Sequence, residues 1–345
     1  MVKRFLMLAS IAAHLHGFAE DPFIPNDPLF ENQWGLASTG PYHIKAPEAW
    51  ALEKGSKKIA IVVLDTGIDY THPDLKNNMW INPNEIPGNG IDDDGNGYID
   101  DVHGVNVITG SGDPMDDNGH GTFMAGIIGA EGNNGIGITG VMNHVSLIAC
   151  KFLDNAGSGS TENAIKCLDY VADLAQRDIG VHIIATNNAW GGNLNTEALM
   201  AAIKKHQDLG ILFVTSAGGE GLNIDLHKMY PASFPLDNIV VTTAMNSWGT
   251  LTFFANYGPN SVHIASPGQS ILSTLPHGQY GFQSGSVATG FVSGVIGLMK
   301  SKKPDLSYQD LKEKIMKTAS PLASVDDSDR IMSGGFIDAA RCLID

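Results

Sequence analysis

Three short motifs place an aspartate, a histidine and a serine in that order along the chain. They read Leu64-Asp65-Thr66-Gly67, His120-Gly121-Thr122 and Gly285-Ser286-Val287-Ala288. A serine hydroxyl becomes a nucleophile when a neighbouring histidine takes its proton, and a carboxylate can orient that histidine. The three residues could therefore carry out acyl transfer if the fold brings them together. Each has a structural alternative when it is taken alone, because such residues commonly form turns and helix caps.

The segments around these motifs predict elements that meet at one edge of a sheet. Residues 59–64 form an apolar, β-branched run, which indicates a buried parallel strand ending at the motif aspartate. Residues 125–130 are apolar and predict a helix that begins near the motif histidine. Residues 287–299 are apolar on all sides and indicate a buried helix after the motif serine. The N–H groups at the start of that helix would face a developing oxyanion.

The rest of the chain alternates predicted strands and helices. Buried strands are predicted at residues 181–185, 211–215 and 239–243, and amphipathic helices at 161–177, 196–207 and 307–317. Right-handed βαβ crossovers join such elements into a parallel sheet. The sequence therefore predicts a three-layer α/β fold, in which helices cover both faces of a doubly wound, mostly parallel sheet. Ligands bind at the carboxyl ends of the strands in such folds.

The order of the motifs separates the known serine triads. The α/β-hydrolases run Ser, Asp, His and the chymotrypsin barrels run His, Asp, Ser, whereas the subtilisins run Asp, His, Ser. The chain resembles the subtilisin-like serine proteases, or subtilases, over nearly everything after residue 20, and most clearly at residues 26–50, 62–75, 120–130 and 284–294. The resemblance implies a serine endopeptidase in which Ser286 is the nucleophile, His120 the base and Asp65 the residue that orients His120.

Several positions depart from the family pattern around these residues. Gly219 stands where the family usually has an asparagine that donates to the oxyanion, so the Ser286 N–H would remain as one donor. The other departures are Phe123, Ala189, Gly285, Gly290 and Phe291. Two functions therefore stay open: an endopeptidase with reduced activity, or a pseudoprotease that keeps the fold and binds peptides.

A peptide substrate would lie along the segment Trp190-Gly191-Gly192 as an added strand, held main chain to main chain. The predicted substrate-binding residues are Ala189, Trp190, Gly191, Ala217 and Gly218.

An acidic insert between the first two motifs predicts a calcium loop. Its alternating oxygen donors resemble the first part of an EF-hand loop, and the predicted ligands are Asp92, Asp94, Asn96, Tyr98 through its carbonyl, and Asp100. The twelfth position is His103 and not glutamate, so the full EF-hand pattern fails. Crowded carboxylates repel each other without a cation. The alternative is a solvated acidic loop.

The family resemblance implies a second calcium site. Its side-chain ligands would be Asp27, Asp74 and Asn134, joined by the carbonyls of Gly132, Ile136 and Ile138. Carboxylate, amide and carbonyl oxygens are the ligands that calcium prefers. We therefore expect one to two structural calcium ions as the only cofactors.

Residues 1–19 have the pattern of a secretory signal peptide. Lys3-Arg4 precedes an apolar run at 5–15, and Gly17-Phe18-Ala19 supplies small residues at both cleavage-determining positions. We expect export to the periplasm or the extracellular medium, and a peptidase domain over residues 20–345 without an evident propeptide. The alternative is an N-terminal helix of the fold. The run is, however, too short to span a bilayer, and the segment that resembles the catalytic domain begins only after it. No membrane segment is expected after signal removal.

Composition excludes several other functions. The net charge of −16 argues against binding to nucleic acid. Three cysteines allow at most one internal disulfide, and the absence of Cys-x-x-Cys and His-Glu-x-x-His motifs argues against zinc sites. The length of 345 residues and the absence of a linker indicate one large domain, which we expect to be a monomer acting on proteins or peptides.

Overall fold

A nine-stranded sheet forms the centre of the computed structural model, which describes residues 21–192 and 195–344. Its strand order is β10-β11-β7-β6-β5-β4-β1-β3-β2, and all neighbouring pairs are parallel except β10 and β11. The strands are β1 Gly55–Asp65, β2 Gly104–Asn106, β3 His144–Lys151, β4 His182–Asn188, β5 Leu212–Ser216, β6 Ile239–Met245, β7 Ile264–Pro267, β10 Ser320–Pro321 and β11 Gly335–Phe336. A separate antiparallel hairpin consists of β8 Ile271–Leu275 and β9 Gln279–Gln283. The predicted leader, residues 1–19, lies outside the described residues.

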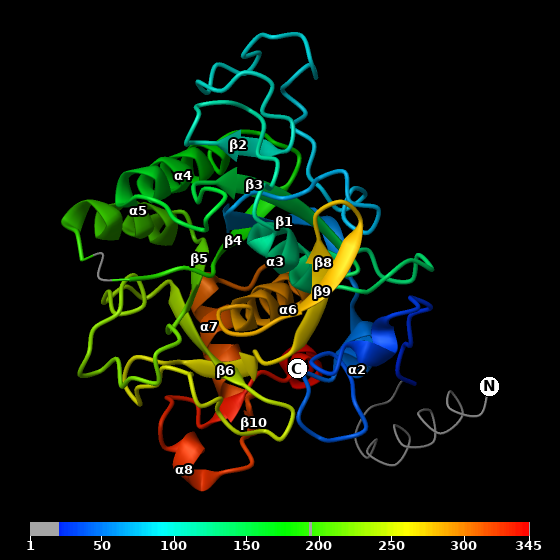
Figure 1. Cartoon of the computed structure of the whole chain (residues 1–345), viewed down its shortest axis with the longest axis vertical. Helices are drawn as coiled ribbons and strands as arrows, with labels where there is room; N and C mark the ends of the chain where they lie inside the picture. Colours follow the sequence, from blue (N-terminus) through cyan, green and yellow to red (C-terminus); the bar gives the residue numbers. More distant parts are fainter. Residues whose placement is uncertain (1–20, 193–194, 345) are drawn as a thin grey trace.

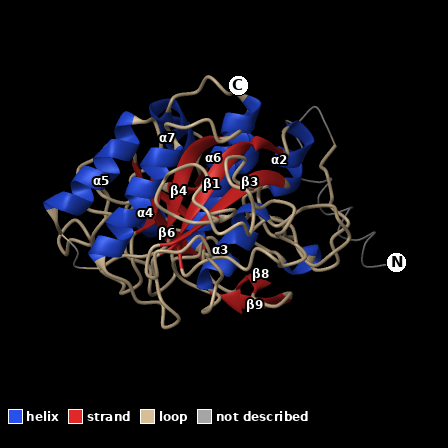
Figure 2. Cartoon of the chain, turned by 90° about the horizontal axis from the view of Figure 1, so that it is seen from above, coloured by secondary structure: helices blue, strands red, loops and turns tan. Residues whose placement is uncertain are grey.

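Helices cover both faces of the sheet (Figure 1, Figure 2). They are η1 Phe30–Asn32, α2 Ala46–Leu52, α3 His120–Gly129, α4 Thr161–Leu174, α5 Glu197–Asp208, α6 Ala288–Lys302, α7 Tyr308–Lys317, α8 Val325–Ser328 and α9 Ala339–Leu343. Alternate residues of β1 enter two separate cores. One core, with Ile61 and Val63, contains α3 and α6, and the other, with Val62 and Leu64, contains α4 and α5. This three-layer arrangement confirms the predicted fold class.

The predicted elements around the motifs and along the sheet are confirmed with small shifts at their ends. The strand predicted at 59–64 lies within β1, and the helix predicted at 287–299 corresponds to α6. The helix predicted from the apolar run 125–130, with its start near the motif histidine, corresponds to α3, whose first residue is His120. β3, which lies between β1 and β2 in the sheet, is not among the strands predicted above. None of the helices in the described ranges combines the length and apolar character of a membrane-spanning helix.

One disulfide joins β3 to α4. It links Cys150 to Cys167, and both residues are fully buried. Cys342 is a free, buried cysteine, and burial raises the pKa of its thiol to about 12. The pairing agrees with the limit of one internal disulfide that three cysteines allow.

His206 on α5 leads to a prediction about acid stability. Its Nε2 atom lies 2.8 Å from the carbonyl oxygen of Leu168, and its Nδ1 atom has no hydrogen-bond partner among the described residues. Burial lowers the pKa of His206 to about 4. Between the ordinary value of 6.5 and pH 4, the unfolded chain therefore binds a proton that the folded chain excludes. Folding stability should fall as the pH falls through this window, by up to about 3 kcal/mol.

Urea unfolding at pH 7 and pH 4.5 measures this loss. His206→Leu should lose less stability than the parent over the same interval, and the exposed His227→Gln should behave like the parent. Equal losses in all three proteins would show that His206 does not contribute.

Candidate active site

The structure brings the three motif residues together at the carboxyl edge of the sheet. Asp65 ends β1, His120 begins α3, and Ser286 lies two residues before α6. The Nδ1 atom of His120 lies 2.8 and 2.9 Å from the two carboxylate oxygens of Asp65. On the other side of the ring, Nε2 lies 3.4 Å from the hydroxyl of Ser286. Such a contact commonly shortens when substrate binds.

Charge and burial act in opposite directions on His120. Burial disfavours the charged imidazolium, but the negative charge and hydrogen bond of Asp65 outweigh it, so the pKa of His120 is raised above 6.5. Asp65 is fully buried and accepts a further hydrogen bond from the N–H of Thr66 at 2.7 Å. The carboxylate is thus fixed on the side of the ring that faces away from the serine.

A groove of about 600 Å³ opens beside His120 and Ser286. Four of the five predicted substrate-binding residues line it, namely Ala189, Trp190, Gly191 and Gly218. The fifth, Ala217, is not among the lining residues: it is fully buried, and its N–H donates to the Thr242 carbonyl. Gly192 lines the groove as well, but its N–H and carbonyl are already paired with Tyr230.

The position expected to supply an oxyanion donor offers no side chain. Gly219 is exposed, and its neighbours Gly218 and Glu220 line the same groove as Ser286. The Gly219 N–H donates to the Glu220 carboxylate at 2.9 Å, and that carboxylate also accepts from Asn256. A Cβ added at Gly219 would meet no atom within 4 Å. The backbone therefore leaves room for a larger residue there.

Packing explains two of the other departures from the family pattern. A Cβ at Gly290 would lie 2.8 Å from the side chain of Ile127, so α6 and α3 approach too closely for a larger residue. Phe291 fills the space beside Gly35, where a Cβ would come within 2.7 Å of its ring. Gly285 has a φ of +109°, which favours glycine directly before Ser286. The residues present at these three positions therefore fit the local backbone and packing around Ser286.

Comparison with known proteins assigns the family. The sequence pattern of the subtilase family matches residues 56–334. The chain belongs to the subtilase family. This subtilase is 35% identical over 302 residues to subtilisin-like protease 1 of Plasmodium vivax, covering 82% of this chain and 46% of that protein. It is 32% identical to thermitase of Thermoactinomyces vulgaris, covering 87% and 93% of the two chains.

The match covers most of this chain but only part of each Plasmodium relative. This subtilase spans about half of their length, 46% of the P. vivax protein and 54% of subtilisin-like protease 1 of Plasmodium berghei. Among solved structures, a protease of Pseudoalteromonas arctica PAMC 21717 superposes with a TM-score of 0.73 at 22% identity, covering 92% of this chain and 98% of that one. That superposition supports the subtilisin-like fold.

The calcium site implied by the family resemblance comes together between the N-terminal segment and two loops. Asp27 accepts from the N–H groups of Asn133 and Asn134 at 2.7 and 3.1 Å, and the Asn134 amide donates to Asp74 at 2.8 Å. Burial raises the pKa of Asp27 and raises that of Asp74 to about 6. Ile138 donates its N–H to Asp74 at 2.9 Å. Two buried carboxylates beside each other fit a cation, provided that the Asn134 amide turns its oxygen toward them.

The loop that carries Asn134 also contains the predicted carbonyl ligands Gly132, Ile136 and Ile138.

The acidic insert, at the top of Figure 1, forms a second cluster with altered membership. Carboxylate oxygens of Glu85, Asp92 and Asp94 lie within 4.8 Å of one another, and Glu85 is 6% exposed. Glu85 is not among the ligands predicted from the sequence. Glu85 belongs to the same insert, but it precedes the EF-hand-like run, so the pattern of that run does not include it.

Three other predicted ligands of this insert have different contacts. The carboxylate of Asp100 accepts from the N–H groups of residues 88–90, at 2.8 to 3.2 Å, so the structure does not bring it into the acidic group. Asn96 donates its amide to Asp101 at 3.0 Å. The Tyr98 ring packs against Tyr170 at a centroid distance of 5.6 Å, a contact that leaves the prediction for the Tyr98 carbonyl untested. The N–H groups of the insert therefore hold the Asp100 carboxylate in place.

The groove also contains residues that the sequence analysis missed. Phe152 and Leu153 follow β3, so recognition of that strand would have identified them as residues at a carboxyl end. Glu220 and Met229 lie in loops without a periodic pattern. The remaining lining residues are Thr66, Asn118, Gly157, Ser158, Gly159 and Ser216.

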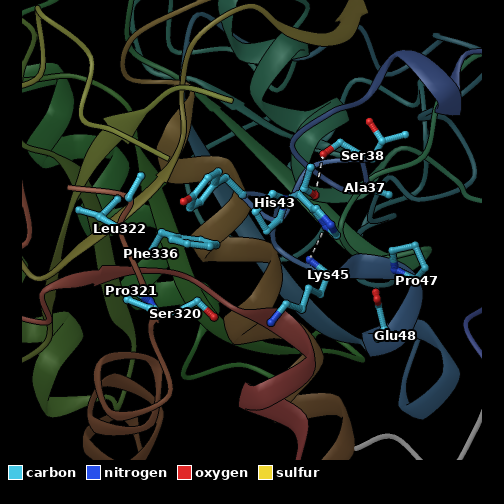
Figure 3. Close-up of a pocket in the computed structure, with 15 residues that line it drawn as sticks. Ala37, Ser38, His43, Lys45, Pro47, Glu48, Ser320, Pro321, Leu322 and Phe336 are labelled. Atoms are coloured by element: carbon cyan, nitrogen blue, oxygen red, sulfur yellow. Dashed lines mark hydrogen bonds between the residues drawn. The ribbon is translucent and has the colours of Figure 1, made fainter. Parts of the chain in front are cut away.

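A second cavity, of about 410 Å³, lies apart from the three motif residues. Figure 3 shows its lining, which combines His43 and Lys45 with Phe336 and Leu322. Lys45 pairs with Asp338 at 2.6 Å. The cavity contains none of the triad residues, so the groove beside Ser286 is the candidate active site.

Proposed function

We propose that this subtilase is a serine endopeptidase that hydrolyses peptide bonds through an acyl-enzyme. Ser286 Oγ attacks the carbonyl carbon of the scissile bond while His120 Nε2 takes its proton, and the proton then passes to the leaving amine. Asp65 accepts the Nδ1–H of His120 and keeps Nε2 directed at the serine. Water then attacks the acyl-enzyme, with His120 acting again as the base.

One observation carries this proposal: the Asp65, His120 and Ser286 contacts form an unbroken chain that ends at an open groove. Backbone edges at the groove suit a peptide that pairs as an extended strand. In the predicted segment Gly192 is paired with Tyr230, so the peptide would pair with main-chain groups of Trp190 and Gly191.

A second candidate function is favoured by Gly219. Without an oxyanion donor there, the groove could bind peptides without cleaving them, as a pseudoprotease does. The two functions differ in whether Ser286 is an activated nucleophile, and cleavage of a peptide distinguishes them.

Cleavage of a panel of chromogenic peptides tests the endopeptidase. Ser286→Ala should reduce kcat by roughly 10³-fold or more, because the nucleophile is lost. Ser284→Ala is the matched control. This exposed residue lies two positions away, its hydroxyl accepts from the Ser270 N–H at 2.9 Å and does not contact His120, and its loss should leave kcat unchanged. Cleavage that persists in Ser286→Ala would contradict the assignment.

The pH profile of the same reaction has a defined sign. His120 acts as a base only when it is neutral, so kcat/KM should rise with pH through the pKa of His120. Because Asp65 raises that pKa, the acid limb should lie above 6.5. Asp65→Asn should move the limb to lower pH and lower kcat at the same time.

We also propose a structural Ca²⁺ at each acidic cluster and export of the chain. Asp27 and Asp74 would hold one ion, and Glu85, Asp92 and Asp94 the other. A bound ion supplies positive charge that neutralises crowded carboxylates. The disulfide between β3 and α4 supports export, because disulfides persist mainly in oxidising compartments.

A further inference from the structure

Asp116 is a buried carboxylate near His120 that has no part in the chemistry described above. It is 5% exposed, and its two oxygens accept five hydrogen bonds. Oδ1 accepts from the Thr66 hydroxyl at 2.8 Å and from two N–H groups of the loop before His120, at 2.9 and 3.0 Å. Oδ2 accepts from both the hydroxyl and the N–H of Thr122, at 2.5 and 2.9 Å.

The two threonine hydroxyls have defined directions. Thr66 Oγ1 accepts from the N–H of Gly121 at 2.9 Å, and Thr122 Oγ1 accepts from the N–H of Asp69 at 2.9 Å. Each hydroxyl therefore uses a lone pair for a backbone N–H and directs its proton to Asp116. Both threonines are fully buried, so water does not compete for these bonds.

This network ties together the two segments that carry Asp65 and the proposed base, His120. Thr66 directly follows Asp65, and Gly121 directly follows His120. The helix that begins at His120 has no side-chain cap from its own N-cap residue, Gly119. Asp116 supplies that cap and also holds the segment after β1. Asp116 thus braces both segments, in addition to the direct bond from the Gly121 N–H to the Thr66 hydroxyl.

We propose that Asp116 is a positioning residue for the proposed proteolysis, holding His120 in line between Asp65 and Ser286. The proposal rests on the endopeptidase function. Asparagine cannot replace this residue, because each oxygen faces at least one backbone N–H. A carboxamide would place its NH₂ group against an N–H in either orientation.

Asp116→Asn should lower kcat by roughly 10- to 100-fold and change KM by less than about threefold, because a small misplacement of the base is expensive only in the transition state. It should also move the acid limb of the pH profile to lower pH, because the negative charge of Asp116 helps to raise the pKa of His120. Asp113→Asn is the matched control: it removes the same charge from an exposed residue of the same loop and should leave kcat unchanged.

A second pair of variants tests the network if Asp116→Asn does not fold. Thr122→Ser keeps the hydroxyl and should retain the parental kcat, whereas Thr122→Val should lose roughly as much as Asp116→Asn. Ile315→Ala, in the core on α7, serves as a variant that is destabilised away from the groove. It should keep its kcat at temperatures where it is folded. A purely structural role would give equal kcat for the serine and valine variants.

A measurement without catalysis separates this proposal from the endopeptidase proposal. In the Ser286→Ala background, the NMR titration of the His120 ring, assigned by its loss in His120→Gln, should shift to lower pH in Asp116→Asn and not in Asp113→Asn. Unchanged titration together with unchanged kcat would overturn the role of Asp116. Absence of cleavage by the parent, with the titration shifted as stated, would overturn the endopeptidase function but not the interaction between Asp116 and His120.

Discussion

Replacing Gly219 with asparagine should raise kcat by up to roughly 10²- to 10³-fold. The upper limit comes from subtilisin, a member of the same family, in which loss of the corresponding asparagine donor reduces kcat by about that factor. The added amide would donate mainly to the oxyanion of the transition state, so KM should change much less. The exposed backbone at Gly219 leaves space for the new side chain. Steady-state kinetics on a chromogenic peptide measures the gain.

Gly219→Ala is the control for this prediction. It adds a Cβ without an amide, so it should leave kcat close to that of the parent. A folded Gly219→Asn protein whose kcat equals that of the parent would show that the missing donor is not limiting. That result would favour the peptide-binding function.

Removal of calcium should lower the melting temperature by roughly 5 to 10 °C. An ion that binds only the folded chain adds RT ln(1 + [L]/Kd) to the free energy of unfolding, which is about 2.7 kcal/mol when the free ion is at a hundred times Kd. The melting temperature of a large domain falls by about 2 to 4 °C for each kcal/mol that is lost. The buried pair of Asp27 and Asp74 and the cluster around Glu85 should each contribute. Thermal unfolding with and without chelator, at fixed ionic strength, measures the shift.

Single variants assign the two clusters. Asp74→Asn and Asp92→Asn should each remove part of the calcium-dependent shift, and Asp305→Asn, an exposed residue outside both clusters, should leave it intact. Identical melting curves with and without chelator, after metal removal is verified by elemental analysis, would contradict calcium binding.

The sequence predicts the centre of the fold well because apolar runs report burial within one segment. The strand at 59–64 and the helix at 287–299 are buried on all sides, and both are confirmed. β3 was missed although it is buried after its first residue. The hairpin of β8 and β9 was not predicted, because β9 is half exposed and its sequence has no clear alternation of apolar and polar residues.

The candidate site could be predicted only where its residues belong to local motifs. The triad residues stand in such motifs, and the structure brings them together. Ala217 was misplaced because the sequence shows that it follows a strand, but not which way its side chain points. Glu85 and Asp116 could not be predicted, because their contacts are not visible in one segment of the sequence. Glu85 meets Asp92 and Asp94 in an irregular loop, and Asp116 accepts from Thr66, which lies far away in the chain.

Reaction with a fluorophosphonate probe tests the central claim most directly, because only an activated serine reacts. We expect one adduct per chain, located by mass spectrometry on the peptide that contains Ser286, and no adduct in Ser286→Ala or His120→Ala. Absence of an adduct in folded, calcium-loaded protein, or an adduct that survives Ser286→Ala, would contradict the assignment of Asp65, His120 and Ser286 as a catalytic triad.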